Sequence, residues 1–141
     1  MVTQALPSAS VELEIPFHDV DVMQIAWHGH YVKYFEIARC RLLDRYDFNY
    51  QEMHDAGHSW PVIDLKVRYT KPLRFQQRIK VTATLVEWEF RLRIRYEITD
   101  AQSGAKLTTG QTDMVAIDNQ SGEMLLASPA VVYQKFGLAQ A

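Results

Sequence analysis

Two carboxylates and two histidines lie close together in residues 17–36, which read FHDVDVMQIAWHGHYVKYFE. Asp19 and Asp21 stand where a strand pattern ends, and His28 and His30 stand where a helical pattern begins. The first N–H groups of a helix have no partner within the helix and carry a partial positive charge. The spacing therefore predicts a carboxylate and a helix N-terminus directed at the same volume, which suits an anion or a developing oxyanion.

The chain has the size and composition of one globular domain. It has 141 residues, 48% hydrophobic and 23% charged, so we expect a single domain over residues 1–141. The formal net charge of −2 argues against a nucleic-acid partner or an anionic membrane surface. The single Cys40 cannot form an internal disulfide, and neither a signal-peptide pattern nor a membrane-length apolar run is present. We therefore expect a cytoplasmic protein.

Two regular elements must position the carboxylates and histidines. Residues 11–17 alternate between apolar and polar side chains, which predicts a half-buried strand. Pro16 lacks an N–H and fits the edge or the end of that strand. A helical pattern runs from about residue 29 to residue 46, with apolar residues over most of its circumference. Such a helix is usually surrounded, here by a sheet curled around it.

The rest of the chain predicts an antiparallel sheet. A short helix over about residues 50–56 ends at Gly57, and Ser128 with Pro129 fits the cap and first residue of a closing helix. Four alternating segments lie between them, over residues 63–69, 79–85, 90–98 and about 107–117. The fold is predicted to be α+β, with one long helix against a curved antiparallel sheet. The face of the sheet that the helix does not cover, and the edges of the sheet, favour pairing with a second copy of the chain.

The site segment and its downstream motifs resemble one family. The D-x-D pair, the loop ending in Trp-His, and Tyr31 and Glu36 on the helix are similar to hotdog-fold acyl-CoA thioesterases of the 4-hydroxybenzoyl-CoA thioesterase and YbgC type. The likeness covers nearly the whole chain, continuing in Gly57, Trp60-Pro61-Val62, Tyr69-Thr70-Lys71-Pro72-Leu73 and Glu87-Trp88. It implies a hotdog fold, a curved antiparallel sheet wrapped around one long central helix. It also implies a homo-oligomer, a dimer or a dimer of dimers, with active sites between subunits.

The implied reaction is hydrolysis of an acyl-CoA or acyl-carrier-protein thioester to the free carboxylic acid and the thiol. By this resemblance Asp21 is the catalytic carboxylate, either a nucleophile or a general base. Backbone N–H groups near His28 would polarise the carbonyl. The side chain of His28 could orient water, hydrogen-bond the thioester or tune Asp21; its alternative is a helix-capping residue with no chemical role. No cofactor is implied beyond the coenzyme A of the substrate.

Several residues have supporting roles. Asp19 is predicted to hydrogen-bond nearby backbone N–H groups at the strand exit. Glu36 lies two turns beyond His28 and is either a support for the site or a structural partner of Arg39 or Lys33. A backbone N–H near Ser59, from the neighbouring subunit, is suggested by the resemblance, although the benzoyl-type enzymes have Gly there. The remaining supporting candidates are His30 and Tyr31.

The acyl end is predicted to contact the apolar residues Met23, Ile25, Trp27, Trp60 and Val62. Arg91, Arg93 and Arg95 alternate on one strand face and form a basic stripe. Arg91 is best placed by the resemblance to contact the coenzyme A nucleotide. The alternatives are a solvated strand face for Arg91 and a competing basic patch of Lys71, Arg74 and Arg78. No spacing among the histidines and aspartates matches a zinc motif, so no metal site is predicted.

Two other functions remain open from the sequence. Acyl hydratases and dehydratases of the same fold pair a histidine with a carboxylate, as Asp21 and His28 could. The second alternative is a protein that binds acyl groups without catalysis. Fold alone does not separate these functions, because function depends on the site.

Overall fold

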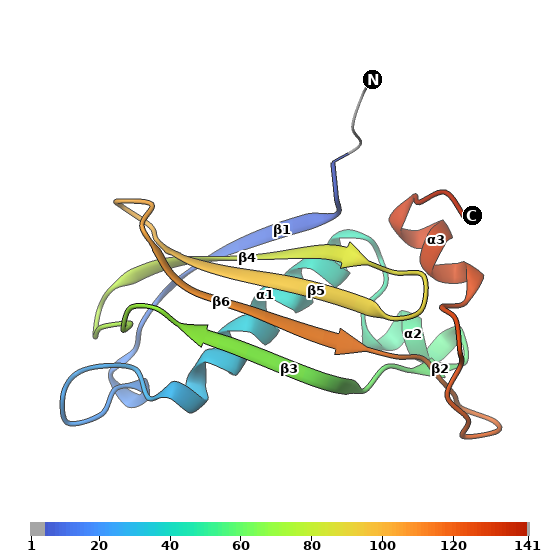
Figure 1. Ribbon diagram of the computed structural model, residues 1–141, viewed down its shortest axis with the longest axis horizontal. Coiled ribbons are helices and arrows are strands. Elements are labelled where there is room, and N and C mark those ends of the chain that lie inside the picture. Colours follow the sequence, from blue (N-terminus) through green and yellow to red (C-terminus); the bar gives the residue numbers. More distant parts are fainter. Residues whose placement is uncertain (1–4, 141) are drawn as a thin grey trace.

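One antiparallel sheet and one long helix form the body of the protein in the computed structural model, which describes residues 5–140 (Figure 1). The sheet has five strands in the order β1-β4-β5-β6-β3, and every neighbouring pair is antiparallel. Their bounds are β1 Ser8–Glu14, β3 Val62–Tyr69, β4 Arg78–Glu87, β5 Leu92–Asp100 and β6 Lys106–Met114. The helix α1 (Tyr31–Arg45) crosses one face, called here the inner face. The predicted α+β architecture is confirmed.

The helix α1 buries a single stripe of side chains against the inner face. Its buried residues recur at intervals of three and four, as expected for one helix face, and they are Tyr31, Tyr34, Phe35, Ala38, Arg39, Leu42 and Leu43. Glu36, Ile37 and Arg41 on the opposite side are exposed. Within one chain, the sheet covers this buried face of α1, and the opposite side is exposed.

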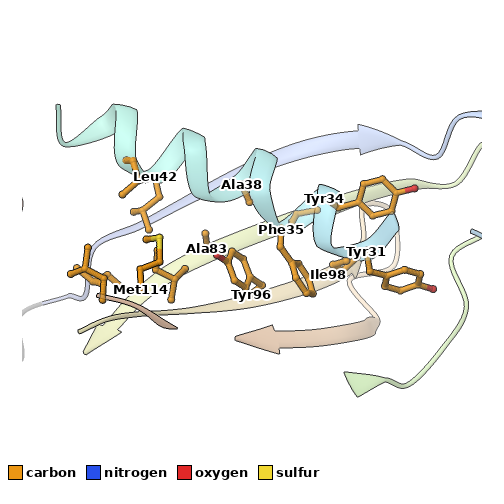
Figure 2. Packing of buried hydrophobic residues seen from close by; sticks show 14 of the residues in the cluster. Tyr31, Tyr34, Phe35, Ala38, Leu42, Ala83, Tyr96, Ile98 and Met114 are labelled. Carbon is orange, nitrogen blue, oxygen red and sulfur yellow. The ribbon is translucent and has the colours of Figure 1, made fainter. Parts of the chain in front are cut away.

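Phe35 packs α1 closely against β5 and β6. Its ring stacks on Tyr96 of β5, with centroids 4.6 Å apart and planes 12° apart (Figure 2). It also lies directly over Gly110 of β6, where an added Cβ would overlap two carbons of the ring. The absence of a side chain at Gly110 thus allows the helix to approach the strand.

Smaller elements close the end of the molecule that holds the C-terminus of α1. They are α2 (Tyr50–Asp55), β2 (His58–Ser59), β7 (Ile117–Asp118) and α3 (Ala130–Phe136), and β2 pairs with β7. Asn49 and Glu52 form a capping box at the start of α2, and Gly137 ends α3 in the left-handed conformation with φ of 66°. Within residues 5–140, no helix is long and apolar enough to cross a membrane.

Several predicted boundaries are corrected. The strand predicted over residues 11–17 begins at Ser8 and ends at Glu14, and Phe17 lies exposed in the 3-10 turn η1 (Phe17–Asp19) because Pro16 cannot continue the ladder. Phe90 is also exposed, before β5. The segment 107–117 divides into β6 and β7.

The predicted cap of the closing helix is also corrected. The cap of α3 is Pro129, and the Ser128 hydroxyl has no hydrogen-bond partner among the described residues. Of the predicted loose start at residues 1–8, residues 1–4 lie outside the described residues.

Replacing Gly110 with alanine tests the helix-to-sheet contact. The new methyl group must displace Phe35, and overpacking of this kind typically costs about 1–3 kcal/mol of unfolding free energy. We expect Gly110→Ala to lower the urea midpoint, and the double variant Phe35→Leu with Gly110→Ala to lose less than the two single changes combined. A Gly110→Ala protein as stable as wild type would contradict this packing.

Candidate active site

A cavity of about 350 Å³ opens beside the start of α1. The loop between η1 and the 3-10 turn η2 (His28–His30) forms one wall, and the segment after β3 forms the other. In Figure 1 this loop lies at the end of the molecule opposite to β2. The cavity brings together many of the predicted site residues and is lined by Asp21, Ile25, Ala26, Trp27, His28, Tyr31, Tyr69, Thr70, Lys71 and Pro72.

The carboxylate of Asp21 is held by its own loop. Its Oδ1 accepts hydrogen bonds from the backbone N–H of Met23 at 2.8 Å and of Ile25 at 3.4 Å. Its backbone N–H donates to the carbonyl of Ile25, and Gln24 turns the chain with φ of 61°. Within residues 5–140, Oδ2 of Asp21 accepts no hydrogen bond. The loop therefore fixes one oxygen and leaves the other available.

The start of the helix presents unused backbone donors. The N–H of His30 donates to the carbonyl of Trp27, and that of Tyr31 donates to the carbonyl of His28. Among the described residues, the N–H groups of His28 and Gly29 have no acceptor. The Trp27 indole lies so close to Gly29 that an added Cβ would overlap the ring. The absence of a side chain at Gly29 thus leaves room for the indole beside the helix start.

His28 lies in the cavity without a hydrogen bond to Asp21 in the described part of the chain. Its ring packs on Trp27 at a centroid distance of 5.0 Å and faces the Tyr69 ring edge-on at 6.3 Å. Its carbonyl accepts a hydrogen bond of 2.8 Å from the Tyr69 hydroxyl. No side-chain cap is made at the start of η2, so the helix-capping role considered for His28 is not observed.

Asp19 is buried, and its partners are side chains. Lys33 Nζ donates to Oδ1 at 2.7 Å, and the Tyr34 hydroxyl donates to Oδ2 at 2.8 Å. The prediction that this carboxylate binds backbone N–H groups is therefore wrong, because α1 brings two stronger donors to it. Burial favours a higher pKa for Asp19, but the hydrogen bonds from Lys33 and Tyr34 outweigh it and lower the pKa. Burial and the bond to Asp19 raise the pKa of Tyr34.

Other predicted residues lie outside this cavity. Glu36 is exposed and reaches Arg39 at 3.9 Å, which matches its structural alternative. Ser59 bonds Asn119, and Trp60 packs against Phe48 with centroids 6.1 Å apart. These last residues belong to the α2 and β2 end, together with Val62 at the start of β3. A single chain thus separates Ser59, Trp60 and Val62 from Asp21.

Three further predicted residues, Met23, His30 and Arg91, also do not line the cavity. Met23 is 70% exposed at the loop tip and does not line the cavity. His30 packs edge-on against Trp27 at 5.4 Å, and its Nε2 lies 3.9 Å from Asp19 Oδ1. Arg91 forms ion pairs with two carboxylates, that of Glu87 at 3.3 Å and that of Asp113 at 3.7 Å. Its guanidinium is therefore engaged with acidic partners.

Four residues of the site were not selected from the sequence. Tyr69 was expected only in the strand over residues 63–69 and Lys71 only in a separate basic patch, yet both line the cavity. Lys33 was considered only as a structural partner of Glu36, and Tyr34 was not selected. The D-x-D turn followed by a helix is the signal that could have suggested a contact from the first helical turn to Asp19.

A larger hollow of about 590 Å³ lies on the outer face of the sheet, the face away from α1. Lys66, Arg68 and Arg95 contribute cations to it, and Glu97 its carboxylate. It contains no histidine and no helix start, so the chemistry of acyl transfer fits the cavity at Asp21 better. Among residues 5–140, no cluster of three His, Cys, Asp or Glu side chains could hold a metal ion.

Comparisons with known proteins agree with this geometry. Residues 15–136 match the family model described as the Thioesterase-like superfamily. A provisionally named esterase of Synechocystis is 28% identical over 118 residues, covering 83% of this chain and 71% of that protein. YneP of Bacillus subtilis, provisionally named an acyl-CoA thioesterase, is 31% identical over 77 residues, 55% of this chain and 53% of YneP. The DHNA-CoA thioesterase of Staphylococcus aureus superposes with a TM-score of 0.75 at 28% identity, covering 84% of this chain and 80% of that structure.

Fold and site together define a hotdog-fold enzyme of acyl thioester chemistry. The chain belongs to the Thioesterase-like superfamily. The predictions of family, fold and enzyme class from the sequence are thereby confirmed.

The acid stability of the protein tests the environment of Asp19. Because its pKa lies below the ordinary value of 3.8, its ionised form stabilises the fold above that pH, and this contribution is lost as the pH falls further. We expect the unfolding free energy of wild type to decrease below about pH 3.8 more steeply than that of Asp19→Asn, measured by urea unfolding at several pH values. Equal slopes would contradict a lowered pKa.

Proposed function

We propose that this protein hydrolyses an acyl-CoA, or an acyl-carrier-protein thioester, to the carboxylic acid and the thiol. The observation that carries the proposal is the cavity lined both by Asp21, whose carboxylate has one unbonded oxygen, and by His28, whose backbone N–H is unused, as is that of the adjacent Gly29. Thioester hydrolysis needs an attacking or water-activating group and a donor for the oxyanion. The cavity supplies both.

In the reaction, the thioester carbonyl oxygen points at the N–H groups of His28 and Gly29. As a general base, Oδ2 of Asp21 takes a proton from water while the water oxygen attacks the carbonyl carbon. The oxyanion then collapses, the carbon–sulfur bond breaks, and the thiolate takes up the proton. As a nucleophile, Asp21 would instead attack the carbonyl carbon and expel the thiolate, which leaves an anhydride that water then opens to the acid and free Asp21. Both routes use the Asp21 carboxylate and the backbone N–H groups of His28 and Gly29.

The walls of the cavity suggest how the substrate lies. Ile25, Trp27 and Tyr31 offer apolar and aromatic contact, compatible with an aryl acyl group such as the one named for the Staphylococcus aureus enzyme. Lys71 supplies a cation at the same cavity, whereas Arg91 is paired with Glu87 and Asp113. Lys71 is therefore the better candidate to meet the phosphates of coenzyme A.

Replacing Asp21 with asparagine tests the proposed chemistry. The change keeps size and hydrogen-bond acceptance at Oδ1 but removes the base, so kcat should fall roughly 100- to 10,000-fold. The measurement is thiol release from a panel of aliphatic, aryl and 3-oxoacyl thioesters. Asp55→Asn, an exposed carboxylate bonded to Gln51, is the matched control and should retain wild-type rates.

The same assay separates the rival functions. An Asp21→Asn protein as active as wild type would contradict the role of Asp21. If wild type releases no thiol from any coenzyme A or carrier-protein thioester, the thioesterase proposal fails. Hydration of crotonyl-CoA without thiol release would identify a hydratase, and binding without turnover an acyl-binding protein.

The proposal includes a homodimer formed through β3. One edge of β3 pairs with β6, and within residues 5–140 the other edge pairs with no strand. Apolar side chains of this strand are exposed, with Ile63 at 55%, Leu65 at 42% and Tyr69 at 47%. An unpaired edge with apolar side chains favours strand pairing, and a twofold axis would place β3 beside its copy.

Antiparallel pairing of two β3 strands would also complete the site. The Val62 end of one strand would then lie beside the Tyr69 end of the other, and Tyr69 lines the cavity at Asp21. Ser59 and Trp60 come directly before β3 in the chain. The partner's Ser59 and the partner's Trp60 would thereby approach Asp21, which supports a site shared between subunits.

A charge placed on β3 tests the dimer. Leu65→Glu should shift the protein toward monomer at micromolar concentration, because a carboxylate would be buried in the new interface. Light scattering after gel filtration gives the mass. Leu126→Glu, a more exposed leucine outside the strands, is the control and should leave the mass unchanged. A wild-type protein that is still a monomer at a protein concentration of about 50 µM would contradict the dimer.

A further inference from the structure

Asp19 lies two residues before the proposed catalytic carboxylate and binds two different parts of the site. We infer that Asp19, through Lys33 and Tyr34, is a positioning residue that sets the catalytic loop against the start of α1. The inference rests on the proposed function, because the reaction it affects is the thioester hydrolysis at Asp21. It adds a role for three residues that do not line the cavity.

The carboxylate of Asp19 joins the loop to the helix. It is 2% exposed and accepts hydrogen bonds from Lys33 and Tyr34, both in the first turn of α1. Tyr34 is itself 3% exposed, and Figure 2 shows Tyr31 and Tyr34 at the same end of the buried cluster, with hydroxyls directed away from it. A charged acceptor between two donors at 2.7 and 2.8 Å makes a strong and directional link.

The backbone of Asp19 binds the other end of the loop. Its carbonyl accepts a hydrogen bond of 3.0 Å from the N–H of Trp27, and a bridge between Val20 and Ala26 follows. The loop that carries Asp21 is therefore closed at its base by Asp19. One residue thus fixes the loop base by its carbonyl and the helix start by its carboxylate.

Two histidines surround the same carboxylate. The Nε2 atoms of His18 and His30 lie 3.6 and 3.9 Å from Asp19 Oδ1. The ring of His30 also packs against Trp27, whose indole covers Gly29. A contiguous set of contacts therefore runs from Asp19 to the proposed oxyanion donors. A shift of Asp19 would move the attacking group and the donors relative to each other.

A role limited to stability does not need this arrangement. Buried ion pairs are weak evidence for stability, since apolar side chains of similar volume often replace them without loss. Relative placement of reacting groups is different, because a displacement of about 1 Å can cost about a hundredfold in rate. The expected signature of Asp19 is thus a change in kcat with the fold intact.

The test compares Asp19→Asn, Lys33→Met and Tyr34→Phe with Asp113→Asn. Asp113 is a matched control, because it is also 2% exposed and is bonded to a cation, Arg93, at 2.9 and 3.1 Å, but lies on the outer face. We expect Asp19→Asn to lower kcat about ten- to a hundredfold with KM within about threefold, at a temperature where all variants are fully folded. Asp113→Asn should keep wild-type kcat.

Coupling between the partners gives a second readout. If Asp19 acts through Lys33, the double variant Asp19→Asn with Lys33→Met should be no slower than Asp19→Asn alone. Multiplicative losses, or a kcat for Asp19→Asn equal to wild type, would overturn the inference. The inference would also be overturned if the loss in kcat disappears when the rate is expressed per folded protein molecule.

A third readout does not depend on turnover. Acrylamide quenching of Trp27 fluorescence, taken as the difference from a Trp27→Phe protein, should increase in Asp19→Asn and not in Asp113→Asn. Unchanged quenching in Asp19→Asn would overturn the inference even in an inactive protein. If quenching increases but wild type hydrolyses no thioester, the proposed function fails while the positioning of the loop by Asp19 stands.

Discussion

The fit of Phe35 over Gly110 determines how closely α1 can lie on the sheet, and the rest of the site follows from that distance. The ring stacks on Tyr96 and occupies the space that a side chain on β6 would need. Because α1 is one rigid element, its position on the sheet also sets where its N-terminus lies. The donors of His28 and Gly29 are therefore placed by packing in the core, not by the loop that precedes them.

The loop that carries Asp21 must then be matched to that helix start. Asp19 makes the match, since its carboxylate binds the first turn of α1 and its carbonyl binds Trp27. The segment after β3 supplies the opposite wall, with Leu73 accepting from Ala26 and Tyr69 donating to the His28 carbonyl. Three separate stretches of chain thus converge on one cavity. In a dimer through β3, the partner's Ser59 would add a fourth.

Local patterns predicted much of this arrangement. The helix from about residue 29 and the later strands followed from periodicity, and Asp21, Trp27, His28 and Tyr31 share the cavity because they are close in sequence.

The errors arise where tertiary contacts decide. Helical spacing left Arg39 and Lys33 open as partners of Glu36, and the folded chain pairs Glu36 with Arg39 and turns Lys33 toward Asp19. Alternation placed Phe17 on a buried face, but the strand ends before it. The apolar residues of β3 are exposed in one chain, and in the proposed dimer through β3 a second copy would cover them.

A crystal structure of the Asp21→Asn protein with an acyl-CoA bound tests the central claim most directly. The account predicts that the thioester lies in the cavity beside α1, with its carbonyl oxygen about 2.7–3.1 Å from the backbone nitrogen of His28 or Gly29 and its carbonyl carbon facing Asn at position 21. A thioester bound elsewhere, for example in the hollow on the outer face of the sheet, or with its carbonyl directed away from the helix start, would contradict the account.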